Sequence, residues 1–209
     1  MPVRLNGSTS GYTELSAPAV AGDNNIALPT GNGSAFQILR NGATAGTTEF
    51  TDKIVSGTAV ASTSGTSIDF TGIPSWAKRV TVMFAGVSTS GTSGQQIQLG
   101  TSGGVVTTGY TSGAFHSANA STFATSTTGF ILSVGNNSLA VDTKHGAIVI
   151  SNIGSNNWVE QGVLHSAGYN VGNSCAGSVT LSGTLDRVRI TTVNGTDTFD
   201  AGSINILYE

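Results

Sequence analysis

The sequence predicts an all-β protein in which a region of short strands precedes a β-sandwich. Charged residues make up only 9% of the 209 residues, against about 25% in a typical soluble domain. Glycine is abundant, with 29 residues, and serine and threonine together outnumber all charged residues. Gly, Ser, Thr and Asn disfavour helix interiors, whereas Thr, Val and Ile suit a pleated, half-buried surface. The composition therefore favours strands over helices.

Residues 1–56 form a first region, in which apolar residues are sparse. Clusters of turn formers at 22–25, 29–33 and 41–42 divide it into strands of only a few residues. Such strands bury too little apolar area to offset about 1–2 kcal/mol of backbone entropy per residue. Because the apolar residues still recur regularly, we expect this region to complete its core with copies of itself or with a partner, rather than to be disordered.

Residues 57–209 form a second region with stronger strand patterns. Apolar and polar residues alternate with period two at 80–87, 187–191 and 204–208, which predicts strands with one buried face. Further strands are expected at 67–70, 95–99, 130–134, 147–150, 158–164 and 178–181. Asn194 and Gly195 predict a tight turn. Many short strands without a helical period predict a sandwich, of the jelly-roll type, in this second region.

Charge, hydropathy and cysteine content exclude several classes of partner. The net charge is -3, and the chain has no run of Lys or Arg of the kind that nucleic-acid binding requires. No apolar segment approaches the roughly 20 residues of a membrane helix, and the N-terminus has no apolar core of a signal peptide. Cys175 is the only cysteine, so we expect no intrachain disulfide and no cysteine-based zinc site. We predict no nucleic-acid partner, no membrane insertion and no cofactor.

The sequence contains no pattern that predicts catalysis. His116, His145 and His165 are widely spaced, and none lies in a metal-ligand pattern. Ser75 and Lys78 match a Ser-x-x-Lys motif, but that motif opens a helix in the enzymes that use it, and here it leads directly into a strand. We therefore predict that the protein is not an enzyme and has no catalytic, cofactor-binding or metal-binding residues.

Two carboxylates and four aromatic residues are the remaining candidates for a site. Asp197 and Asp200 lie close enough in sequence to form the pair, about 5–10 Å apart, that glycoside hydrolysis needs; we interpret them instead as solvated caps of a turn. Exposed aromatic rings next to loops can stack on sugars, and the candidates are Tyr110, Phe115, Trp158 and Tyr169. For each of these four, we favour packing in the core or in an interface over a role in binding.

Three segments resemble parts of bacteriophage fibre proteins. Residues 16–35 contain Ala-Pro-Ala, Leu-Pro and spaced glycines, and are similar to N-terminal segments of structural appendages of marine and cyanobacterial phages. Residues 67–82, SIDFTGIPSWAKRVTV, are similar to a segment that opens the C-terminal domain of many tail-fibre-like phage proteins. Residues 200–206 also resemble the closing strand of such domains.

The resemblance implies a structural virion protein of a tailed phage: a homotrimeric, β-rich fibre subunit exposed on the particle after assembly in the host cytoplasm. Residues 1–56 would anchor it to other virion proteins, and residues 57–209 would face outward and bind a glycan or protein of the host surface. The resemblance carries over no catalytic residue. Two alternatives stay open: a head decoration or head-fibre protein docked on the capsid, and a polysaccharide-degrading appendage.

Overall fold

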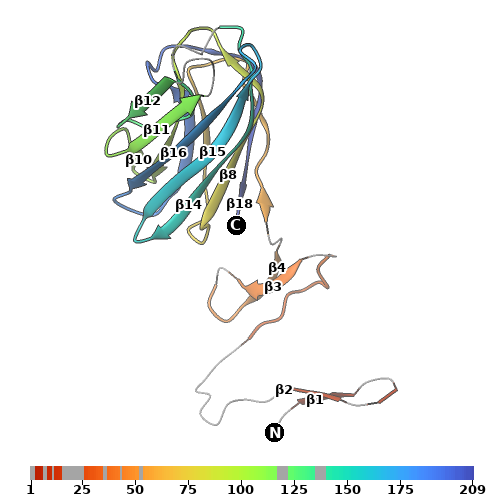
Figure 1. The fold of residues 1–209 in the computed structure, drawn as a ribbon. Helices are drawn as coiled ribbons and strands as arrows, with labels where there is room; N and C mark the ends of the chain where they lie inside the picture. Colours follow the sequence, from red (N-terminus) through yellow and green to blue (C-terminus); the bar gives the residue numbers. More distant parts are fainter. Residues whose placement is uncertain are drawn as a thin grey trace. The chain divides into compact units, whose positions relative to one another are not determined.

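The computed structural model describes residues 3–6, 9–10, 12–15, 26–34, 37–42, 44–51, 54–116, 122–134 and 140–209. The chain divides into two compact units, Met1–Lys53 and Ile54–Glu209 (Figure 1). Strand β5 (Val55–Ser56) lies before the boundary expected between residues 56 and 57, yet it pairs with the C-terminal strand of the second unit. The described parts of the chain contain no helix able to span a membrane.

Two antiparallel hairpins provide the strands of the first unit. They are β1 (Val3–Asn6) with β2 (Tyr12–Leu15), and β3 (Ile38–Asn41) with β4 (Thr48–Thr51). A parallel bridge also joins Ala27 to Thr47. These short ladders satisfy backbone hydrogen bonds locally, but a two-stranded hairpin alone is only marginally stable in water.

The described apolar side chains of the first unit are largely exposed. Ile26 is 69% exposed and Leu28 is 76% exposed. On β3, Ile38 and Leu39 are 46% and 53% exposed, although they point to opposite faces of the strand. No described residue of this unit belongs to the buried hydrophobic cluster of the protein. The described part of the first unit therefore lacks a core of its own.

The larger sheet of the second unit, which we call the large sheet, contains nine strands in the order β12-β11-β16-β15-β14-β8-β18-β5, with β6 also paired to β18. Besides β5, its strands are β6 (Val60–Ala61), β8 (Arg79–Thr89), β11 (Thr111–His116), β12 (Thr122–Ser126), β14 (Lys144–Gly154), β15 (Asn157–Ser166), β16 (Val171–Thr180) and β18 (Phe199–Tyr208). Figure 1 shows β11, β16, β15, β14, β8 and β18 side by side in one layer.

The second sheet, which we call the small sheet, contains five strands in the order β10-β9-β17-β7, with β13 also paired to β9. They are β7 (Ser67–Thr71), β9 (Gln95–Thr101), β10 (Gly104–Val105), β13 (Phe130–Ile131) and β17 (Arg187–Thr192). The strand pairs of both sheets are antiparallel. The all-β prediction is confirmed, and the two sheets of this unit give a sandwich-like arrangement.

Pairing between strands distant in sequence is nested. Early strands pair with late ones in the ladders β6–β18 and β7–β17. The strands between them pair in the same inward order, as β8–β14 and then β9–β13. The β15–β16 hairpin follows β14 and joins the free side of the large sheet, where β11 and β12 extend it further.

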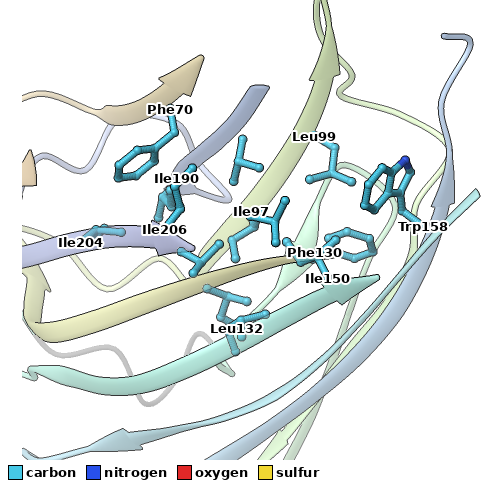
Figure 2. Packing of buried hydrophobic residues seen from close by; sticks show 14 of the residues in the cluster. Phe70, Ile97, Leu99, Phe130, Leu132, Ile150, Trp158, Ile190, Ile204 and Ile206 are labelled. Carbon is cyan, nitrogen blue, oxygen red and sulfur yellow. The ribbon is translucent and has the colours of Figure 1, made fainter. Parts of the chain in front are cut away.

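One hydrophobic cluster lies between the two sheets (Figure 2). Fully buried aliphatic side chains come from both layers: Val80, Val82, Val87, Ile148, Ile150, Leu164 and Ile204 from the large sheet, and Ile97, Leu99, Val188 and Ile190 from the small sheet. Burying one such side chain contributes about 1.5–3 kcal/mol. The second unit therefore has a complete core, in contrast to the described part of the first.

The strands with the clearest alternation in sequence are present. Residues 80–87 lie in β8, 187–191 in β17 and 204–208 in β18, and their alternate side chains enter the core as predicted. Two other expectations were inaccurate. The strand expected at 130–134 covers only Phe130–Ile131, and the one expected at 178–181 is the end of β16, which begins at Val171.

The corner between β7 and β8 shows how local sequence directs the chain from one sheet to the other. Gly72 has a φ of 74°, which a residue with a side chain rarely adopts. After it, the Trp76 ring lies 5.7 Å from the Tyr208 ring of β18.

The turn predicted at Asn194 and Gly195 is also present, with Gly195 at a φ of 68°. That turn connects β17 and β18, which belong to different sheets.

Candidate functional site: the outer face of the large sheet

The four aromatic candidates from the sequence occupy different environments. Tyr110 and Trp158 are each only 2% exposed, so the favoured interpretation of core packing is confirmed for both, and their candidacy as surface-binding residues is wrong. Core packing explains them: the Tyr110 ring packs edge-on against Phe130, with 5.0 Å between ring centroids. Phe115 is 41% exposed on β11, and Tyr169 is half-buried in the turn between β15 and β16. The structure does not bring the four together.

Hydrogen bonding holds the Tyr110 hydroxyl inside the protein. The Leu99 N–H donates to this hydroxyl at 2.7 Å, and the hydroxyl donates to the Val106 carbonyl oxygen at 3.1 Å. Burial raises the pKa of Tyr110 to about 12, and the hydrogen bond from Leu99 offsets part of this shift. Tyr110 therefore links β9 to the loop before β11, because a buried hydroxyl needs such partners.

Two rows of outward-facing side chains cross seven neighbouring strands of the large sheet. The first row consists of Phe123, Phe115, Ser174, Val163, Ala147, Met83 and Asn205. The second consists of Thr125, Gly113, Ala176, Gln161, Val149, Thr81 and Leu207. We call these two rows the large-sheet face. Neither row contains Asp, Glu, Lys or Arg.

Three apolar side chains stand out from this face. Phe123 is 67% exposed, Val163 is 56% exposed and Phe115 is 41% exposed. Phe115 and Phe123 are directly opposite each other on β11 and β12, where cross-strand side chains interact. The sequence analysis did not identify Phe123. The other residues of β12 are small and polar, so apolar and polar residues do not alternate clearly along it and the strand is hard to recognise in the sequence.

A glycine on β11 shapes the surface beside the aromatic pair. A Cβ added to Gly113 would lie 2.9 Å from the Phe123 ring, so the ring covers the backbone where a larger residue would push it away. Next to it lies an open hollow of about 410 Å³, lined by residues of β11, β12 and β16, among them Thr125, Ala176 and Ser178. The short side chains of β16 leave this depression in the face.

The outer surface of the small sheet carries charged side chains. Arg189 of β17 and Asp69 of β7 form a bidentate ion pair, with both N–O distances 2.7 Å. The Asp69 carboxylate raises the pKa of Arg189. Arg187 pairs with Asp186 at 2.8 Å on the same side. The outer surface of the small sheet is thus solvated by charges, whereas the large-sheet face has none.

A polar cluster lies inside the second unit, near one end of the large sheet. Lys144 forms an ion pair with Asp142 and donates a hydrogen bond to Ser166. The Lys144 side chain is 1% exposed and that of Asp142 0%. Burial lowers the pKa of Lys144, and Asp142 offsets part of this shift. Asn173 also donates to Ser166, at 2.8 Å, and the Gly168 N–H donates to Asp142 at 2.8 Å. This cluster ties β14, β15 and β16 together.

The candidate carboxylate pair from the sequence is engaged in local hydrogen bonds. Asp197 accepts from the Ser93 N–H at 3.0 Å and from the Asn194 side chain at 2.7 Å, which is the predicted capping role. Asp200 accepts from the Ser88 hydroxyl and lies in β18 rather than in a turn. Within the described ranges, no group of three His, Cys, Asp or Glu side chains is arranged to hold a metal ion. Ser75 lies in a turn before β8, where the described chain forms no helix.

Comparisons of this chain with protein-family models, with curated proteins and with solved structures find no match. Its function therefore has to be argued from its own residues and geometry.

Proposed function

We propose that this chain is a structural virion protein of a tailed phage, a homotrimeric fibre subunit that acts by binding. Its first unit anchors it to other virion proteins, and its second unit faces the host surface. The observation that supports this proposal most directly is the contrast between the units. Ile26 and Leu28 are 69% and 76% exposed in the first, whereas the second has a full core. A segment that exposes so much apolar surface fits a role that buries it against another chain.

The nested strand pairing supports a jelly-roll topology for the second unit. A jelly roll is an antiparallel ribbon rolled into two sheets, so its first strand pairs with its last, its second with the next to last, and so on. The ladders β6–β18, β7–β17, β8–β14 and β9–β13 follow this order. Viral structural proteins and carbohydrate-binding domains both use this architecture, in agreement with the resemblance of residues 67–82 to phage fibre segments.

Deletion of residues 1–53 tests the anchoring role. We expect the shortened chain to fold, because the second unit contains the whole hydrophobic cluster, and to be absent from virions. A phage that lacks the gene would be grown in host cells that supply the shortened chain. The protein would then be detected by immunoblotting of the purified virions. The full-length chain supplied in the same way is the control. Incorporation of the shortened chain at the level of this control would disprove the anchoring role.

Immunogold labelling of intact virions tests the location of the protein. We expect antibodies against the second unit to label the distal part of the tail, because this unit faces outward in the proposed arrangement. Virions that lack the gene serve as the control. Labelling of the capsid would instead support the head-fibre alternative, and unlabelled virions that also lack the protein by mass spectrometry would contradict a virion role altogether.

A further inference from the structure

We infer that the large-sheet face is the surface through which copies of this chain pack against one another. The inference rests on the homotrimer of the proposed function and identifies the residues that make it. The occupant of the face is a neighbouring copy of the same chain, rather than a host molecule.

The first argument is the distribution of charge. Among the described residues of the seven strands that form the face, outward-facing charged residues occur only at strand ends, at Arg79 and Asp200. Arg79 is paired with Glu209, and Asp200 is hydrogen-bonded to Ser88. The outer surface of the small sheet, by contrast, carries the Asp69–Arg189 pair. Depletion of charge is the compositional mark of an interface centre.

The second argument is that Asn205, an amide side chain on the face, has partners within the chain. The Asn205 side chain donates to the Ser56 hydroxyl at 3.3 Å and accepts from the Ile206 N–H at 2.8 Å. Its oxygen and one of its N–H groups therefore stay hydrogen-bonded when the amide is covered. Phe115, Phe123 and Val163 then supply the apolar area that remains exposed in the single chain. When the faces of three copies turn toward a common three-fold axis, each meets the same uncharged surface of its neighbours, so the contact leaves no charge unpaired.

The third argument is size. Neighbouring strands lie about 4.8 Å apart, so seven strands give a width of about 29 Å. On β8, β14, β15 and β16 the two rows of the face, together with the row on either side of them, extend about 20 Å along the strands. The flat area is roughly 600 Å² before the relief of the side chains is added, close to the roughly 800 Å² that each partner buries in a stable interface. The face together with its adjoining rows is thus large enough for an interface between protein chains.

Substitution of Val163 by glutamate tests the inference on the full-length chain. We expect light scattering over a range of protein concentrations to give the mass of three copies for the wild type. In V163E, the dissociation constant of the oligomer should rise at least a hundredfold, because each contact would have to bury an unpaired carboxylate. F123E repeats the test at the edge of the same face. The matched control is V193E, since Val193 is an exposed valine, 46% accessible, that lines a cavity with residues of the small sheet.

Each possible outcome supports or overturns the inference. Circular dichroism and urea unfolding verify that the variants fold, as expected for side chains that are 46% to 67% exposed. The inference is supported if V163E and F123E weaken the oligomer and V193E does not. An oligomer that is unchanged in V163E and F123E overturns the inference but leaves the fibre proposal intact. Variants that keep the mass of the oligomer but no longer bind host cells have the same two consequences. A monomeric wild-type protein overturns both this inference and the proposed homotrimer. The immunogold labelling of virions tests the virion role separately.

Discussion

We expect substitution of Glu160 by glutamine to raise the free energy of unfolding by roughly 3 kcal/mol above pH 8 and to leave it nearly unchanged near pH 4.5. Glu160 lies on β15 with only 3% of its surface exposed and points into the core. Its neighbours across the two adjacent strands are Ile150 and Gly177. Among the described residues, neither carboxyl oxygen has a hydrogen-bond partner. The neutral amide of glutamine avoids placing a charge there.

The sign follows from the pKa. Burial raises the pKa of Glu160 from 4.5 to about 7, and the neighbouring Cys175 thiol lowers it only in part. That thiol itself donates to the Gly162 carbonyl oxygen at 3.6 Å. Between these two pKa values the folded chain holds a proton that the unfolded chain has released. The contribution of Glu160 to the free energy of unfolding is therefore most favourable at low pH and falls by about 1.4 kcal/mol per pH unit as the pH rises through this window.

Urea unfolding of the wild type and of E160Q between pH 4.5 and 8.5 measures this effect. The pH slope should be present in the wild type and absent in the variant. A matched control is E49Q, which removes a carboxylate from the exposed Arg40–Glu49 pair, where the side chains are 33% and 43% accessible. We expect E49Q to keep the wild-type slope. Identical slopes in the wild type and E160Q would show that the Glu160 carboxylate is hydrated or neutralised in the folded protein.

Substitution of Asp142 by asparagine should lower the free energy of unfolding by about 3–5 kcal/mol at pH 7. The variant keeps the shape of the side chain and an acceptor for the Gly168 N–H, but it removes the carboxylate that pairs with the buried Lys144 ammonium. Removal of one partner of a buried ion pair has a large effect because the remaining charge is desolvated without compensation. Chemical unfolding monitored by fluorescence measures the change.

The double variant D142N/K144M separates the charge effect from a packing effect. Methionine keeps most of the length of the lysine side chain and removes its charge, so the double variant should recover most of the lost stability. D69N is the control for an exposed pair, because the Asp69 and Arg189 side chains are each 35% accessible, and we expect a loss below about 1 kcal/mol. A double variant less stable than D142N would show that the ion pair itself, rather than the uncompensated lysine, accounts for the loss.

The sequence alone was sufficient for the secondary-structure class and for several strands. The scarcity of charged residues and the abundance of Gly, Ser and Thr favour strands locally, whatever the rest of the chain does. Residues 80–87, 187–191 and 204–208 alternate so regularly that each forms a strand with one buried face. These features depend on neighbouring residues along the chain, so they can be recognised without knowing which strands meet.

Other strands were not recognisable in this way. Strands β11 and β12 were not predicted, because small residues on both of their faces hide the period-two pattern. Their positions depend on β16, which pairs with β11 through Cys175 opposite Ala114. Glu160 and Lys144 also differ from expectation, since charged residues in a strand normally point to solvent. Both point inward, because their strands are covered on that side by the small sheet and by polar partners.

Alternation in the sequence established that most strands have two unlike faces, but only the tertiary structure decided what covers each face. Nested pairing brings β12, β11, β16, β15, β14, β8 and β18 into one layer, and only then do Phe115, Phe123 and Val163 share an uncharged surface. The same pairing places Tyr110 and Trp158 in the core. The physical reason is that a strand's hydrogen bonds and side chains are satisfied by partners far away in the chain, so its environment is a property of the whole sheet.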